Sequence, residues 1–233
     1  MEPLAEMERS IPGGELAFGH VVGILLAIPS AIIAYLCGCL NGAVIVSKYI
    51  LRDDIRNHGS GNAGLTNFHR TFGGKLTAMV LLLDVVKMIL AVWLGRRLLG
   101  NLPLGALSGP VMAGYWSGLW CLLGHMFPVT FGFKGGKGVL SGVTLMFCLD
   151  WRMGLIALGI FLVVVALTRY ISLGSCLAAV SFPVSTWLFV SREPAILIMS
   201  VFLAGLVIFM HRGNLVRVAR GEERRFSLHR KEK

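Results

Sequence analysis

The sequence predicts an all-α protein that crosses a membrane several times. Apolar residues make up 55% of its 233 positions and charged residues 15%, whereas a soluble domain has about 45–50% and about 25%. A chain of this length cannot bury so much apolar surface in its own core, so lipid must cover the excess. Only helices and closed barrels satisfy their backbone in hydrocarbon. The apolar runs are far longer than barrel strands of about 10 residues, which leaves helices.

Seven apolar runs, each bounded by Gly, Pro or charge, are the candidate membrane helices. The fourth and fifth runs are short and only residues 150–152 separate them, so we expect short tilted helices or a broken hairpin there. The predicted runs cover residues 21–44, 76–93, 104–123, 139–149, 153–167, 173–190 and 195–210.

The basic residues predict the orientation of these runs. With the N-terminus outside, the cytoplasmic segments hold 16 Lys and Arg, the outer segments hold five, and Lys87 lies within a run. This asymmetry follows the positive-inside rule and, with seven spans, places the C-terminus in the cytoplasm. We expect one domain over residues 21–222, an extracytoplasmic extension over 1–20 and a basic cytoplasmic tail over 223–233. The acidic extension has the wrong charge for a signal peptide.

The composition also argues against several other classes. The net charge of +10 does not indicate nucleic-acid binding, because the basic residues lie in loops and in the tail rather than on one soluble face. All five cysteines lie inside apolar runs, which is typical of buried reduced thiols. No spacing of Cys, His or carboxylates indicates a zinc or magnesium site, so we expect no metal and no cofactor.

The first of three unusual polar segments covers residues 56–70. Its glycines permit positive φ, so successive N–H groups could form an anion-binding nest, and Thr66 and Asn67 could cap the next helix. The G-x-G-x-x-G pattern does not indicate a dinucleotide site, because no strand precedes it. The alternative is a plain glycine-rich hairpin. The candidate phosphate ligands are Gly59, Ser60, Gly61, Asn62, Gly64, Thr66, Asn67 and Arg70.

The second polar segment covers residues 124–138. Lys134 and Lys137 are three positions apart in a glycine-rich loop and could clamp a phosphate; alternatively, they only hold the loop inside. The loop is not a Walker motif, because its spacing is one residue short and Gly138 replaces the magnesium-binding Ser or Thr. His125 is either a structural cap or a ligand. The candidates are His125, Lys134, Gly135, Gly136, Lys137 and Gly138.

The third polar segment begins at residue 211. His211, Asn214 and Arg217 are spaced to share one helical face, while the basic residues after them are typical of binding to a lipid surface. Two polar pairs lie elsewhere. Asp84 and Lys87 should pair inside the bundle, with a proton path as the alternative. Ser172 and Ser175 begin the sixth run and are candidates for packing or for substrate binding.

With these segments the chain resembles the bacterial acyl-phosphate:glycerol-3-phosphate acyltransferases, the PlsY family. The resemblance runs from about Ala34 to Glu222, and Cys39, Asn41 and Leu65 depart from it, standing where Ser, Pro and Ala are usual. It rests on Gly59-Ser60-Gly61-Asn62-x-Gly64-x-Thr66-Asn67, Gly124-His125-x-Phe127-Pro128, Phe133-Lys134-Gly135-Gly136-Lys137-Gly138 and His211-Arg212-x-Asn214-x-x-Arg217, and further on the Asp84 and Lys87 pair and Arg169-Tyr170-x-Ser172-Leu173.

The resemblance implies an enzyme of the bacterial inner membrane with its active site on the cytoplasmic face. Its reaction moves an acyl group from acyl phosphate, not acyl-CoA, to the 1-hydroxyl of glycerol 3-phosphate and gives lysophosphatidic acid and phosphate, the first step of phospholipid synthesis. Acyl phosphate is already activated, so no covalent nucleophile is required. The expected partners are the two substrates and the bilayer; whether an enzyme that produces acyl phosphate also binds stays open.

The resemblance also assigns roles. The first segment would hold acyl phosphate or its oxyanion, the two lysines would bind phosphate, and His211 and Asn214 would orient the attacking hydroxyl. The proton of the attacking hydroxyl would go to His211 or to a substrate phosphate oxygen. The catalytic candidates are Ser60, Asn67, Arg70, Lys137, His211 and Asn214; the remaining candidates, with Ser172, Ser175 and Arg217, are assigned to substrate binding. The rival function is transport of an anionic metabolite.

Overall fold

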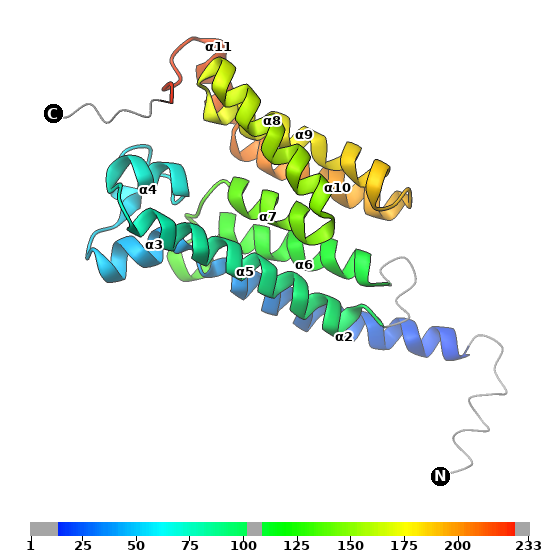
Figure 1. Cartoon of the computed structure of the whole chain (residues 1–233). Helices are drawn as coiled ribbons and strands as arrows, with labels where there is room; N and C mark the ends of the chain where they lie inside the picture. The colour runs from blue at the N-terminus through cyan, green and yellow to red at the C-terminus, as the bar shows by residue number, and fades with distance from the viewer. Residues whose placement is uncertain (1–13, 102–108, 227–233) are drawn as a thin grey trace.

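The computed structural model describes residues 14–101 and 109–226, and every regular element over these residues is helical (Figure 1). This confirms the all-α prediction for the described part of the chain. The helices are α2 (Gly14–Cys39), α3 (Gly42–Ile45), α4 (Leu65–Thr71), α5 (Leu76–Leu99), α6 (Gly109–Met126), α7 (Val139–Leu149), α8 (Trp151–Thr168), α9 (Ile171–Phe189), α10 (Pro194–Met210) and α11 (Arg212–Ala219), with short π- or 3-10 turns at Val46–Ile50, Ile55–Asn57 and Val129–Phe131.

The seven predicted runs correspond to α2 with α3, α5, α6, α7, α8, α9 and α10. By length and composition alone, α5, α8 and α9 can each cross a membrane, and two bent helix pairs raise this number to five over the described residues. The short α7 has 11 residues. Residues 1–13 of the predicted extension, 104–108 of the third run and 227–233 of the tail lie outside the described residues, and residues 14–20 form the start of α2.

The first predicted run is not one continuous helix. It breaks at Leu40 and Asn41, and the two parts bend by 45°. Asn41 has an extended backbone, and its side-chain oxygen accepts the N–H of Val44 at 3.1 Å, so it caps α3. The carbonyl of Leu40, freed by the break, accepts a hydrogen bond from Lys87 at 3.1 Å. Asn41 therefore ends a helix that hydropathy alone predicts to be continuous, and Lys87 binds the carbonyl that the break exposes.

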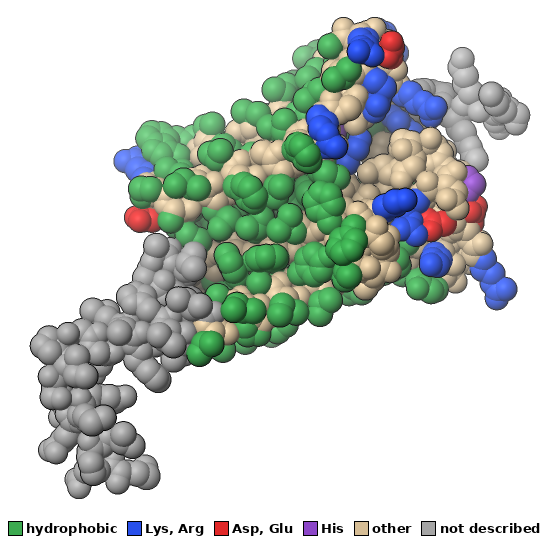
Figure 2. Space-filling model, turned by 180° about the vertical axis from the view of Figure 1, so that it is seen from behind, with side chains coloured by type: hydrophobic (Ala, Val, Ile, Leu, Met, Phe, Trp, Pro, Cys, Tyr) green, Lys and Arg blue, Asp and Glu red, His purple; other side chains and the backbone are tan. Residues whose placement is uncertain are grey.

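A buried core holds the long helices together. Its largest members include Tyr115, Met88, Leu122 and Leu145, all fully buried. α2 and α6 approach closely through glycines: a Cβ added to Gly38 would lie 2.9 Å from the Cα of Gly124. Outside this core, side chains such as Leu162 and Ile198 are exposed. Figure 2 shows apolar side chains over the middle of the molecule, while Lys and Arg gather mostly at the end away from the N-terminus.

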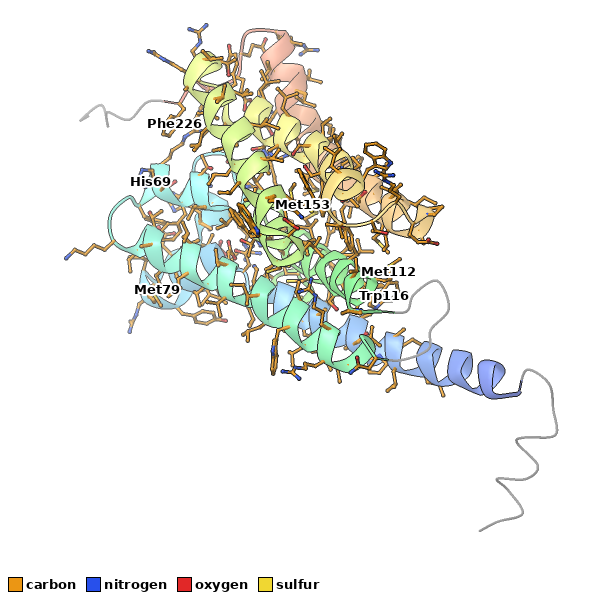
Figure 3. All side chains as sticks on the ribbon, turned by 45° about the vertical axis from the view of Figure 1, so that its right-hand side comes forward. His69, Met79, Met112, Trp116, Met153 and Phe226 are labelled. Carbon is orange, nitrogen blue, oxygen red and sulfur yellow. The ribbon has the colours of Figure 1, made fainter. Side chains whose placement is uncertain are left out.

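The chain brings its polar segments together at that same end. Figure 1 shows α3, α4 and α11 there, together with the last turn of α6 and the first turns of α7 and α9. Figure 3 shows His69, from α4, and Phe226, from the segment after α11, at this end, whereas Met112 and Trp116 lie toward the opposite one. Segments far apart in sequence thus become neighbours, and the backbone N–H of Phe226, for example, donates to the carbonyl of Arg169 at 2.7 Å.

Candidate active site

The three polar segments predicted from the sequence line one cavity of about 520 Å³ at the basic end of the bundle. All six catalytic candidates contribute to its surface, as do most of the binding candidates. The predicted residues that line it are Gly59, Ser60, Asn62, Gly64, Thr66, Asn67, Arg70, His125, Lys137, Gly138, Ser172, Ser175, His211, Asn214 and Arg217.

Four predicted binding residues do not line the cavity: Gly61, Lys134, Gly135 and Gly136. Lys134 is exposed beyond it. The N–H groups of Gly135 and Gly136 donate to the carbonyls of Met126 and His125, both at 3.1 Å, so they are not free to bind an anion. These glycines instead let the loop pack closely, because a Cβ on Gly136 would press into the His125 ring and the Ala63 carbonyl.

Residues 59–70 form one side of the cavity, here called the loop wall, and the buried amide of Asn67 holds it in shape. The Asn67 oxygen accepts the Ser60 N–H at 3.0 Å, and its nitrogen donates to the carbonyls of His58 at 3.0 Å and Asn62 at 3.1 Å. Gly59 and Gly61 adopt the expected positive φ, +60° and +70°. The sequence had offered Asn67 as a helix cap; it lies instead within the first turn of α4, whose cap position is Gly64.

The expected backbone nest of the loop wall is also corrected by these contacts. The N–H of Ser60 is taken by Asn67, that of Gly61 donates to His58 at 2.9 Å, and that of Gly64 donates to Asn62 at 3.0 Å. These donors therefore point at the protein. Among the loop-wall residues that line the cavity, Ser60 and Thr66 carry hydroxyls and Arg70 carries a guanidinium.

Lys137 joins the loop side of the cavity to the opposite side. It lies just before α7, whose N-cap Gly138 has a φ of +77°, and its ammonium donates to the side-chain oxygen of Asn214 on α11. Burial lowers the pKa of Lys137, while the charge of Glu223 opposes that change. Because the Lys137 ammonium is partly desolvated and has one neutral partner, it is suited to bind an anionic oxygen.

The opposite side, here called the tail wall, consists of Ser172, α11 and residues 222–224, and Glu223 organises it. Its carboxylate accepts hydrogen bonds from Ser172 Oγ at 3.0 Å, Asn214 Nδ2 at 2.6 Å and Arg217 Nε at 2.9 Å. Burial alone would raise the pKa of Glu223, but these donors outweigh it and the pKa is lowered. The sequence reasoning missed Glu223; a carboxylate within a basic tail was the available signal.

His211 lies next to the tail wall, where α10 bends into α11, and it is buried. Its Nδ1 lies 2.8 Å from the carbonyl oxygen of Val207. A carbonyl only accepts, so Nδ1 carries the proton and Nε2 keeps its lone pair. Burial lowers the pKa of His211, and the positive charge of Lys137 acts in the same direction. The imidazole is therefore neutral at pH 7 and can accept a proton at Nε2.

The predicted pair of Asp84 and Lys87 is confirmed, with a distance of 2.6 Å between Nζ and Oδ1, and both residues are buried. Lys87 also contacts Nδ1 of His125 at 2.8 Å. Asp84 and His125 both contribute to the cavity surface. The pair is thus connected to the site, which the sequence had not indicated.

One side of the cavity is apolar, and the sequence reasoning did not find it. These residues come from α7, α8 and the start of α9, and they follow directly on the polar walls. They are Val139, Leu140, Val143, Leu158, Phe161 and Ile171. The cavity therefore combines hydroxyls, amides and cations, which suit phosphate groups, with an apolar surface, which suits a hydrocarbon chain.

Comparison with known proteins identifies the family. The profile described as glycerol-3-phosphate acyltransferase matches residues 28–221, which include all three polar segments. The chain belongs to the glycerol-3-phosphate acyltransferase family. A glycerol-3-phosphate acyltransferase of Thermoanaerobacter pseudethanolicus is 43% identical over 85% of this chain and 95% of that relative.

Solved structures agree with this family assignment. A crystal structure of PlsY, an integral membrane glycerol 3-phosphate acyltransferase in its glycerol 3-phosphate form, is 32% identical with a TM-score of 0.75, over 86% of this chain and 96% of that one. The lysophosphatidic acid form of that enzyme is 33% identical with a TM-score of 0.72, over 86% and 95%. This acyltransferase therefore shares its fold with an integral membrane enzyme.

Proposed function

We propose that the cavity transfers a fatty acyl group from acyl phosphate to the 1-hydroxyl of glycerol 3-phosphate. One observation carries the proposal: a single cavity has hydroxyls, amides and cations on two walls and an apolar surface beside them. Both substrates carry phosphate and one carries a hydrocarbon chain, so this surface matches both. The names of the solved relatives, one with glycerol 3-phosphate and one with lysophosphatidic acid, support the same acceptor and product.

The reaction needs positioning rather than a covalent intermediate. The hydroxyl oxygen attacks the acyl carbon, the bond from that carbon to the phosphate oxygen breaks, and phosphate leaves with the electron pair. Lys137 and Arg70 stabilise the charge on the phosphate oxygens, and Asn214 helps to orient the acceptor. The proton of the hydroxyl passes to Nε2 of His211 or to a phosphate oxygen. The neutral state and free lone pair of His211 support the first route.

The protein crosses the bacterial inner membrane seven times, with the N-terminus outside and the cavity and C-terminus on the cytoplasmic side. The gathering of Lys and Arg at the cavity end supports this orientation. Substrates would then reach the cavity from the cytoplasm and from the bilayer. Reporter fusions after Gly100 and at Lys233 should report opposite sides, and a periplasmic Lys233 would reject the orientation.

The donor preference tests the function directly. Purified protein receives glycerol 3-phosphate with either acyl phosphate or acyl-CoA, and the acylated product is measured. The proposal expects product from acyl phosphate and none from acyl-CoA. The rival function, transport of an anionic metabolite, predicts no product with either donor and uptake of glycerol 3-phosphate or phosphate into vesicles that contain the protein.

A further inference from the structure

We propose that the buried Asp84 and Lys87 pair holds His125 as a neutral imidazole with its proton on Nε2, so that His125 is a fixed hydrogen-bond donor to a phosphate oxygen in the cavity. This inference rests on the proposed function and adds to it. It makes Asp84 and Lys87 positioning residues rather than only a structural ion pair.

The hydrogen-bond partners of Lys87 determine the state of the ring. Its Nζ has three acceptors within reach: Asp84 Oδ1 at 2.6 Å, His125 Nδ1 at 2.8 Å and the carbonyl of Leu40 at 3.1 Å. An ammonium has three N–H donors and no acceptor, so each donor has one partner and Nδ1 of His125 must accept. In a neutral imidazole the proton then lies on Nε2.

Charge balance supports the same state. Asp84 Oδ1 also accepts the N–H of Gly42 at 3.2 Å, so the carboxylate is well satisfied as an anion. His125 Nδ1 lies 3.7 Å from that carboxylate oxygen, farther than Lys87 Nζ. Lys87 and Asp84 neutralise each other, and a second cation beside Lys87 would face both burial and repulsion. The thiol of Cys121 lies 4.0 Å from the carbonyl oxygen of Lys87, and the thiols of Cys37 and Cys39 are also close to it.

The Nε2 edge of His125 is left for a ligand. The side chain of His125 is 4% exposed, the ring contributes to the cavity surface, and Nε2 has no hydrogen bond to any of the described residues. Gly136 has no side chain to occupy this edge, and a Cβ there would collide with Nε2. An N–H that faces the cavity without a protein partner favours a substrate oxygen that can accept it.

The first test reads the ring directly. The ¹⁵N resonances of His125 in the detergent-solubilised protein are assigned by their loss in His125→Gln, and the expected spectrum at neutral pH has a protonated Nε2 and a bare Nδ1. Glycerol 3-phosphate alone and inorganic phosphate alone are then added. A change of the Nε2 signal with only the first assigns the contact to the acceptor; a change with both assigns it to a shared phosphate position. A proton on Nδ1, or an Nε2 unaffected by both, overturns the proposal.

The second test uses the pH dependence of Lys87→Met. Without the ammonium, Nδ1–H of His125 can donate to Asp84, and Nε2 becomes a bare acceptor that repels phosphate. Below neutral pH the imidazolium carries N–H on both nitrogens, so the donor returns. We therefore expect kcat/KM to fall roughly 10- to 150-fold at pH 8, and the ratio of variant to wild type to rise as the pH is lowered to about 6.

Two further variants distinguish the proposed effect of Lys87 on the His125 ring from a general loss of structure. In Lys87→Met combined with His125→Gln, the ratio to wild type should not change with pH. Arg152→Met removes the exposed ion pair with Asp150 at the opposite end of the bundle and should leave activity unchanged. A pH-independent ratio for Lys87→Met overturns the proposal. Absence of turnover in the wild type would instead reject the proposed function.

Discussion

In the loop wall a single buried amide, that of Asn67, binds three backbone groups between residues 58 and 62, whereas in the tail wall a single carboxylate, that of Glu223, binds three side chains. The first arrangement is neutral and independent of pH, and its shape is set by the backbone. The second depends on a charge and on side chains that come from separate helices. We therefore expect the loop wall to be preformed. We expect the contacts of the tail wall to be the ones that a change in pH can break.

Lys137 connects the two walls, and its removal has the largest expected effect. Lys137→Ala loses a charge-assisted hydrogen bond worth about 1.5–3 kcal/mol, so kcat/KM should fall about 10- to 150-fold, and further if the contact strengthens in the transition state. The matched control is Lys134→Ala, because Lys134 is exposed and does not line the cavity. Equal activity losses in Lys137→Ala and Lys134→Ala, at equal membrane content, would contradict a specific role of Lys137 in the cavity.

Asn67→Ala breaks the loop wall. It leaves the Ser60 N–H without its partner, and positioning should lose about 1–2 kcal/mol, equivalent to a fall in kcat/KM of about 5- to 30-fold. Because the amide is buried, the melting temperature in detergent should fall as well. Asn57→Ala, an exposed amide of the same segment, serves as the control. A normal melting temperature in Asn67→Ala would contradict a wall held by this amide.

Glu223→Gln breaks the tail wall and should lower kcat/KM about two- to five-fold, since these pairs are partly exposed, with little change in melting temperature. The lowered pKa of Glu223 gives the sign of the pH effect. Its contacts are complete at neutral pH and are lost as the pH falls through that lowered pKa. The ratio of variant to wild type should therefore approach one in acid. Glu193→Gln, exposed at the opposite end, should match the wild type at every pH.

The smallest expected effect is that of a metal chelator. Within residues 14–101 and 109–226, His, Cys and carboxylate side chains form no group of three or more that could hold a metal ion. The carboxylates of Glu222 and Glu223 lie in the tail wall, and that of Glu223 binds Asn214 and Arg217 rather than further metal ligands. Excess chelator should leave the rate unchanged; a loss that magnesium restores would show that a metal ion completes one of the walls.

Much of this arrangement follows from the sequence because the signals are local. Long apolar runs predict the helices, and a buried cation three positions from a carboxylate predicts the pair of Asp84 and Lys87. Clusters of Gly, Asn and His in three segments on one predicted side of the membrane indicate the site. The structure confirms the helices over the described residues and the pair, because these depend only on neighbouring residues or on the period of a helix. It also brings residues of all three segments to one cavity, while the side of the membrane stays a prediction.

The rest depends on tertiary partners. The sequence does not distinguish Lys134 from Lys137, because only the packing of the loop places Lys137 in the cavity and leaves Lys134 outside it. Leu158 and Phe161 follow the same apolar pattern whether they face lipid or the cavity, so the apolar side was not predicted. The expected backbone nest was wrong at Gly61 and Gly64, and the N–H groups of Gly135 and Gly136 are likewise used within the protein, because the availability of an N–H depends on which carbonyl lies opposite.

The most direct test of the account is the stoichiometry of the reaction in the purified, reconstituted wild-type protein. Phosphate and lysophosphatidic acid are measured together after acyl phosphate and glycerol 3-phosphate are added singly or jointly. We expect equimolar phosphate and lysophosphatidic acid, formed only when both substrates are present. Phosphate release without glycerol 3-phosphate, or glycerol 3-phosphate accumulating inside the vesicles without product, would contradict it.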